Sequence, residues 1–151
     1  MIKNRSAVAR LLTALVAVVT AAGALLADFV VPATAAQHMH NDAWAPHAKF
    51  HDAQYIVMSI LLGLLALAVL RWRGGARDAV WTACAILTTP WLGLLSALLF
   101  PGAAIEDPEF DNPAVLGLHP QVFLSVVLLA LLLTAALLVA RPGAARPGHP
   151  A

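Results

Sequence analysis

The stretch VFLSVVLLALLLTAALLVA, residues 122–140, contains no charged side chain. A helix needs about 20 mostly apolar residues to cross the hydrocarbon core of a bilayer. Lipid offers no partner to unpaired backbone groups, so a spanning segment is either a helix or a strand of a closed barrel. Barrel strands alternate apolar and polar side chains over about ten residues, and this stretch does not. It therefore predicts a transmembrane α-helix.

Three stretches upstream have the same character, so the predicted fold is an all-α bundle of four transmembrane helices. The predicted spans are about 8–32, 48–71, 79–100 and 121–140. The second reaches full length only if the polar residues at its start lie at the membrane interface. Pro90 should kink the third span, because proline removes a helical hydrogen bond. Residues 1–151 then form one integral membrane domain, and residues 141–151, rich in Pro, Gly and Ala, form a disordered tail.

The composition also favours a membrane protein. Apolar residues make up 61% of the chain and charged residues 11%, whereas soluble domains contain about 45–50% and about 25%. The net charge is only +1 and there is no basic tract, so nothing indicates a nucleic-acid partner. Cys84 is the single cysteine, which excludes an internal disulfide and a thiolate metal cluster. It lies in an apolar run, where we expect a buried thiol.

The basic residues predict the orientation, because Lys and Arg concentrate on the cytoplasmic side of membrane proteins. Eight of them precede the first span, fill the link between the second and third, or follow the fourth: Lys3, Arg5, Arg10, Arg71, Arg73, Arg77, Arg141 and Arg146. The link between the third and fourth spans contains only acids: Glu106, Asp107, Glu109 and Asp111. We therefore expect a multi-pass protein of the cell membrane, with both termini cytoplasmic and a solvated acidic link outside.

Two features concern the ends of the predicted spans. The four tryptophans lie mostly near those ends, as interfacial aromatic residues do: Trp44, Trp72, Trp81 and Trp91. Residues 1–35 also resemble a secretory signal, with a basic start, an apolar run and Ala33-Thr34-Ala35 as a cleavage site. Cleavage there would leave three spans, whereas the length of the apolar run and its acid favour a retained first span.

Histidines and acids are densest in HMHNDAWAPHAKFHDAQY, residues 38–55, on the predicted outer side. A helix that begins near Pro46 presents one stripe at helical spacing: His47, His51, Gln54 and Met58. The adjacent stripe consists of Asp52, Tyr55 and Ser59. Polar groups at this depth normally face the interior of the bundle rather than lipid.

Groups from other spans should converge on this face. Asp28 lies at the outer end of the first span, where an unpaired carboxylate is costly, and we expect it within about 6 Å of His47 or His51. The candidate catalytic residues are His47, His51 and Asp28, and the candidate substrate-binding residues are Gln54, Tyr55, Trp44 and His119. Simpler alternatives remain: hydrated surface histidines, an Asp28–Lys49 pair, and His119 as a capping residue.

Residues 41–54, NDAWAPHAKFHDAQ, resemble the motif N-x-x-W-x-P-H-A-[KR]-[FY]-H-x-x-Q of a family of small four-helix membrane proteins of unknown function. The motif is matched by Asn41, Trp44, Pro46, His47, Ala48, Lys49, Phe50, His51 and Gln54. An acid late in the first helix, here Asp28, also fits. The resemblance implies the fold and the topology, and it implies no established activity.

Three classes of function fit these residues. In the favoured one, His47, His51 and Asp28 act as general acid and base on a lipophilic small molecule that enters from the bilayer, in an isomerisation, cyclisation or hydrolysis. In the second, His47 and His51 bind a divalent metal together with a carboxylate; the segment lacks the glutamate of H-E-x-x-H, so metalloprotease chemistry is disfavoured, and no cofactor is required. The third is a non-catalytic membrane subunit or ligand-binding protein.

Overall fold

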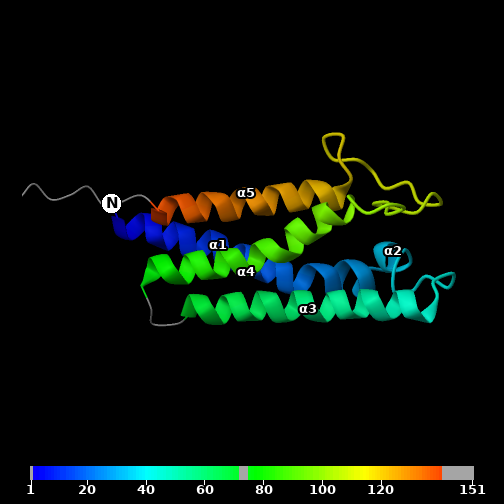
Figure 1. Ribbon diagram of the computed structural model, residues 1–151, viewed down its shortest axis with the longest axis horizontal. Helices are drawn as coiled ribbons and strands as arrows, with labels where there is room; N and C mark the ends of the chain where they lie inside the picture. The colour runs from blue at the N-terminus through cyan, green and yellow to red at the C-terminus, as the bar shows by residue number, and fades with distance from the viewer. Residues whose placement is uncertain (1, 72–74, 141–151) are drawn as a thin grey trace, which may run out of the picture.

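The computed structural model describes residues 2–71 and 75–140. Its four long helices are α1 (Ile2–Leu25), α3 (Pro46–Arg71), α4 (Ala76–Ala97) and α5 (Pro120–Ala140). They run antiparallel in succession, so that α1 begins and α5 ends at the same end of the bundle (Figure 1). The predicted all-α bundle is confirmed, with four helices long and apolar enough to cross a membrane. The predicted tail, residues 141–151, lies outside the described residues.

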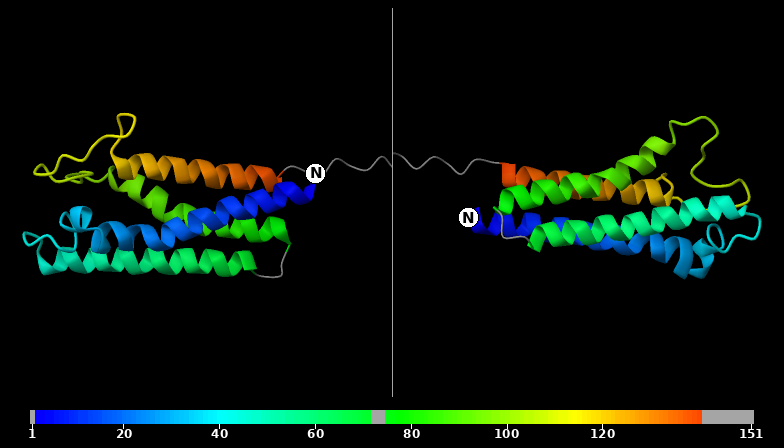
Figure 2. Two further views of the ribbon diagram at one scale, coloured as in Figure 1. Left: turned by 180° about the vertical axis from the view of Figure 1, so that it is seen from behind. Right: turned by 60° about the horizontal axis from the view of Figure 1, so that its bottom comes forward.

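Helices α1 and α4 form the centre of the bundle. α1 contacts the other three long helices, and α4 contacts both α3 and α5, which lie on opposite sides of this central pair (Figures 1 and 2). The core between them contains fully buried apolar side chains from α1 and α4, such as Val16, Val80 and Leu87, together with Leu128 and Leu132 of α5. The buried surface is therefore a narrow seam along the bundle axis.

The outer surface of the bundle is apolar. Leu11 is 70% exposed, Leu133 is 61% exposed and Leu61 is 59% exposed, and each lies in the middle of a long helix. Contact of such a surface with water would be unfavourable over the whole length of the bundle. The surface is compatible with a multi-pass membrane protein, in which lipid tails cover these side chains.

The contact between α1 and α3 is close because small residues face each other. The buried residues of α3 recur every three or four positions: Ile56, Ser59, Gly63, Ala66 and Leu70. A Cβ atom on Gly63 would lie 2.5 Å from the carbonyl oxygen of Ala17 and 2.7 Å from Cβ of Ala21. Small residues of this kind let membrane helices approach each other. They also fix the rotation of α3, and with it the direction of every polar side chain near its start.

One tryptophan differs from the expectation of an interfacial position. Trp91 is only 6% exposed, and its Nε1 donates a hydrogen bond of 3.0 Å to Oγ1 of Thr20 on α1. A buried indole N–H needs an acceptor, and this threonine allows the ring to lie in the core. The expected burial of Cys84 is observed, with its Sγ 3.6 Å from Oγ1 of Thr13.

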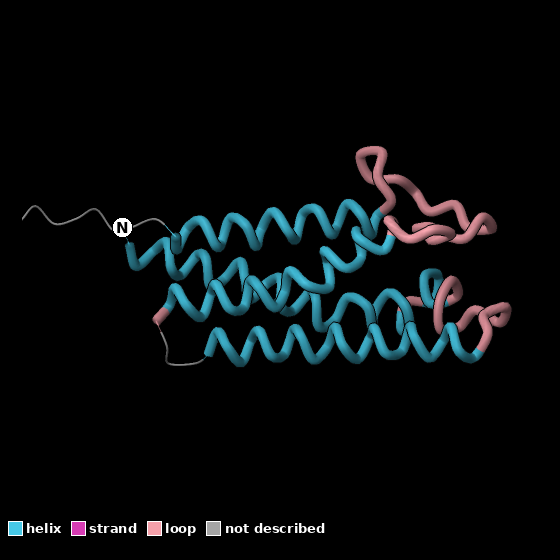
Figure 3. The backbone as a smooth tube through the Cα atoms, in the orientation of Figure 1, coloured by secondary structure: helices cyan, strands magenta, loops and turns pink. Residues whose placement is uncertain are grey.

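The non-helical segments gather mainly at one end of the bundle, which we call the loop end (Figure 3). There α1 continues into a π-helical turn, η1 (Leu26–Val30), and a single α-helical turn, α2 (Pro32–Ala35), before the chain enters α3. The same end carries the connection from α4 to α5. Helix α4 contains Pro90 and bends toward α5 and away from α3 at the loop end, as expected for a helix with an internal proline (Figures 1 and 2).

Candidate functional site

A cavity of about 470 Å³ lies at the loop end where α4 departs from α3. We call it the inner cavity. Its size falls within the usual range of about 300–1,000 Å³ for small-molecule sites. Most of its wall is apolar, with Met58 and Leu62 from α3 and Leu94 from α4. Four ionisable side chains line it as well: Asp28, His38, Asp52 and Tyr55.

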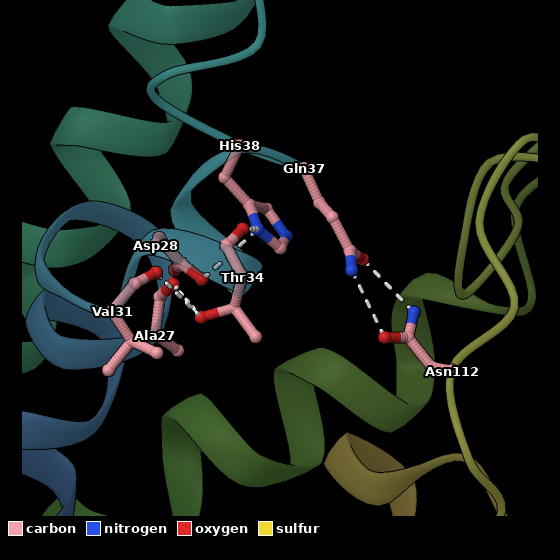
Figure 4. Close-up of polar contacts among 7 residues, drawn as sticks. All are labelled: Ala27, Asp28, Val31, Thr34, Gln37, His38 and Asn112. Atoms are coloured by element: carbon pink, nitrogen blue, oxygen red, sulfur yellow. Dashed lines mark hydrogen bonds and ion pairs between the residues drawn. The ribbon is translucent and has the colours of Figure 1, made fainter.

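Asp28 lies in the π-helical turn and is only 3% exposed. The amide of Val31 donates to the carbonyl oxygen of Leu26 at 2.7 Å, so this turn contains one residue more than an α-helical turn. π-Helical turns recur at functional sites, because the extra residue redirects a side chain. Here the redirected carboxylate faces the imidazole of His38, with 3.6 Å between Oδ1 and Nδ1 (Figure 4).

His38 follows α2 and is held by several neighbours. Its Nδ1 lies 2.9 Å from the carbonyl oxygen of Thr34, and Oγ1 of Thr34 donates in turn to the carbonyl oxygen of Ala27 (Figure 4). The imidazole also packs edge-on against Trp44, with 5.6 Å between ring centroids. Because both polar neighbours of Nδ1 are oxygen acceptors, Nδ1 carries a proton. The chain after α1 thus folds back and holds the imidazole of His38 beside Asp28, while its Nδ1–H donates to the carbonyl oxygen of Thr34.

A second carboxylate enters the same cavity from α3. Asp52 is close enough to Asp28 and His38 for their charges to interact. Within the described residues, two buried carboxylate oxygens have no hydrogen-bond partner, namely Oδ1 of Asp28 and Oδ2 of Asp52. Buried polar atoms are normally hydrogen-bonded, and an unpaired buried carboxylate is especially costly. This end of the inner cavity is therefore suited to a molecule that brings hydrogen-bond donors.

An adjoining cavity of about 410 Å³, the outer cavity, shares Asp28 and His38 with the inner one and is also lined by Trp44 and His119. Polar contacts between the two connections cover it. The side chains of Gln37 and Asn112 exchange two hydrogen bonds of 3.1 and 3.0 Å (Figure 4). Asn112 also donates to Glu106 at 2.9 Å, and this carboxylate lies 3.6 Å from Nε2 of His119. Glu106 is therefore part of the site, whereas the other three acids of the link, Asp107, Glu109 and Asp111, are exposed, as expected for a solvated link.

The structure separates the predicted site residues into two groups. Asp28 and Tyr55 line the inner cavity, and Trp44 and His119 line the outer one. The other three residues, His47, His51 and Gln54, are exposed on α3. They are not among the described residues that line the two cavities. The expected pairing of Asp28 with His47 or His51 is not what the structure shows, because His38 is its partner.

The rotation of α3 explains this difference. The first three residues of the predicted stripe, His47, His51 and Gln54, lie outside the cavity lining, and only its fourth residue, Met58, reaches the cavity. The adjacent stripe, which holds Asp52, Tyr55 and Ser59, lines the cavity throughout. Since α3 is apolar on nearly all sides, hydrophobic periodicity does not identify the face that packs. The small residues Ser59, Gly63 and Ala66 do identify it. This pattern in the sequence could have placed Asp52 in the site. No comparable pattern indicates His38, which lies in a non-helical connection.

The exposed histidines form a contact of their own. Nε2 of His47 and Nε2 of His51 lie 3.0 Å apart at the start of α3. In the chain as described, no group of three or more His, Cys, Asp or Glu side chains is arranged to hold a metal ion. The three-ligand site of two histidines and a carboxylate considered above is therefore not present in this arrangement.

Comparison with known proteins places the chain in a family without adding a function. No curated protein and no solved structure matches it. The model of a protein family described as "Family of unknown function (DUF6640)" matches residues 12–142. That range contains α3, α4, α5, most of α1 and every residue that lines the two cavities at the loop end. The chain therefore belongs to this family of unknown function.

Proposed function

We propose that this protein binds a lipophilic small molecule in the inner cavity and catalyses an acid–base reaction on it, of the isomerisation, cyclisation or hydrolysis class. One observation carries the proposal: a mostly apolar cavity is also lined by an imidazole and by two carboxyl groups, of which Asp28 is buried and Asp52 is half-buried. A site with this composition holds an apolar body and presents proton donors and acceptors to its polar end.

The two carboxyl groups have different surroundings, which suits a division of roles. Asp28 is almost fully buried and lies 3.6 Å from Nδ1 of His38, whereas Asp52 is only half-buried. Enzymes assign acid and base roles to titratable groups by giving them different environments. We assign Asp52 as the group that takes a proton from the substrate, and the Asp28–His38 pair as the group that returns one. Tyr55 lines the same cavity, and we assign it the role of orienting the substrate.

The bend in α4 supports entry from the bilayer. Pro90, Gly93 and Ala97 of α4 line the inner cavity together with Met58 of α3. Gly93, Ala97 and Met58 are also exposed on the surface of the bundle. We propose that the ligand enters between α3 and α4 from the acyl chains of the bilayer. The positions of Arg71 and Arg77 at the opposite end of the bundle favour a loop end on the extracytoplasmic side.

The proposal is tested by untargeted mass spectrometry. The purified full-length chain in lipid nanodiscs is incubated with a lipid extract of the cells that produce it, and conversion is compared with the Asp52→Asn variant. We expect a product that depends on Asp52 and is unchanged by Asp42→Asn, which removes the same charge from an exposed position between α2 and α3. Full conversion by both Asp28→Asn and Asp52→Asn would contradict the assignment.

A second function is favoured by the histidine pair on α3. Two exposed imidazole nitrogens 3.0 Å apart on consecutive turns can both coordinate one divalent transition-metal ion, with water as the remaining ligands. Isothermal titration with Zn²⁺ and Ni²⁺ measures this binding directly. One metal ion per chain in the wild type, lost in His47→Gln and retained in His40→Gln, would favour metal binding. Equal binding by both variants would exclude it.

A further inference from the structure

We propose that the ligand of the inner cavity is a lipophilic amine, whose ammonium group lies between Asp28 and Asp52. The proposal rests on the proposed function, because it takes the inner cavity as the ligand site, and it adds the chemical class of the ligand. Three features of the site support an amine: its charge, its free hydrogen-bond acceptors and the nature of its walls.

The charges around the cavity do not balance. Asp28 and Asp52 are acids, and His38 is the single basic side chain among the described residues that line the inner cavity. The outer cavity adds Glu106 and Asp107 with only His119 as a partner, and neither described lining contains Lys or Arg. Even with both imidazoles charged, the acids remain in excess. A buried carboxylate is stable only with a counter-charge, and a cationic ligand supplies it.

The number of free acceptors distinguishes an amine from other polar groups. Oδ1 of Asp28 and Oδ2 of Asp52 are both buried and have no hydrogen-bond partner among the described residues. A primary ammonium has three N–H donors, so it satisfies both oxygens and one further acceptor. A hydroxyl group has one donor and leaves one oxygen unpaired. A carboxylate or phosphate group has no donor to offer, and the two acids repel it.

The walls accommodate the rest of such a molecule. Met58, Leu62 and Leu94 provide an apolar surface within reach of the bilayer, and Tyr55 stands in the wall beside the two acids. A phenol ring next to a desolvated ammonium contributes a further attraction through its π-face. The cavity of about 470 Å³ admits an aromatic or alicyclic body and a short arm that carries the amine.

Three probes that share one ring system and differ in the polar group test this inference. They are 2-(1-naphthyl)ethylamine, 2-(1-naphthyl)ethanol and 1-naphthylacetic acid. The full-length chain in phosphatidylcholine nanodiscs is dialysed against each probe, and naphthalene fluorescence reports binding above that of empty nanodiscs. We expect the amine to bind about 30-fold more tightly than the alcohol or the acid, because loss of a buried charge partner typically weakens binding by this factor or more. Asp52→Asn should weaken amine binding about 30-fold, and Asp42→Asn should leave it unchanged.

The outcomes separate this inference from the proposed function. If the alcohol or the acid binds as tightly as the amine, the ligand class is wrong, while the cavity remains a site for lipophilic molecules. If none of the probes binds above empty nanodiscs, both proposals fail. Amine binding that is unchanged in Asp28→Asn and Asp52→Asn also overturns the inference. The comparison of the three probes uses the wild-type chain alone. The proposal can therefore be overturned even if a variant fails to fold.

Discussion

The close approach of α3 to α1 at Gly63 makes a sharp prediction for a single methyl group. In Gly63→Ala, the new Cβ would lie 2.5 Å from the carbonyl oxygen of Ala17 and 2.7 Å from Cβ of Ala21. Both atoms belong to short, rigid parts of α1, so they cannot rotate away as the end of a long side chain would. The two helices must separate by about 1 Å to restore ordinary contact distances.

The expected cost follows from this geometry. Overpacking by a methylene group typically destabilises by about 1–3 kcal/mol. Replacing glycine by alanine inside a helix gains about 1 kcal/mol in intrinsic propensity, which would hide part of that cost. Gly23→Ala on α1 is the matched control, because a Cβ there meets no atom within 4 Å. The propensity gain is common to both variants, so their difference reports the overpacking alone. We expect Gly63→Ala to be less stable than Gly23→Ala by about 1–3 kcal/mol.

Unfolding in mixed micelles, followed by circular dichroism as the fraction of sodium dodecyl sulfate rises, measures both variants on one scale. Retained helical content before the transition shows that each variant has folded. Equal unfolding midpoints for Gly63→Ala and Gly23→Ala would refute the reasoning, because they would mean that α3 does not contact α1 through this glycine. The rotation of α3, and with it the position of Asp52 in the cavity, would then also be wrong.

Three further predictions concern the rest of the chain. In a Cys84→Ala background, cysteines placed at Gly75 and Ala104 should react with an impermeant maleimide from opposite sides of a sealed membrane, and labelling from the same side would contradict the antiparallel topology. Trp91→Phe removes the indole donor to a buried threonine hydroxyl and should lower the unfolding free energy by about 0.5–1.5 kcal/mol in the micelle assay; an unchanged midpoint would show that this hydrogen bond is not formed. In the conversion assay, His38→Gln should reduce turnover about 100-fold or more, whereas the exposed His51 should tolerate the same change, and the opposite order would return the site to the helix-start histidines.

The helices and their number could be predicted because each depends on a local property. A run such as residues 122–140 is long and uncharged, and lipid leaves few alternatives to a helix. The position of Asp28 in the site was predictable for a similar reason, since an acid in an apolar span needs a partner. The orientation relative to the membrane depends on the basic residues and stays a prediction.

The identity of the partner of Asp28 could not be predicted, because it depends on non-local geometry. The π-helical turn redirects the carboxylate, and the connection after α2 brings His38 back over it; neither has a periodic signature. The choice between Asp52 and the histidine stripe depends on the rotation of α3. Packing against α1, which is closest at Gly63, helps to set that rotation, and the apolar pattern of α3 carries little information about it.

The amide pair between Gln37 and Asn112 has a consequence for proton supply. In the proposed reaction one group takes a proton and another returns one, so exchange of protons with water would reset both groups after each turnover. The outer cavity reaches Asp28 and His38 from the other side, and two hydrogen bonds between neutral side chains hold its cover. Each such bond contributes about 1 kcal/mol net, so thermal fluctuation breaks the pair often. Under the proposed function, water would then reach the imidazole while the apolar body of a ligand stays in place, and the two cavities would serve as separate routes for protons and for lipophilic molecules.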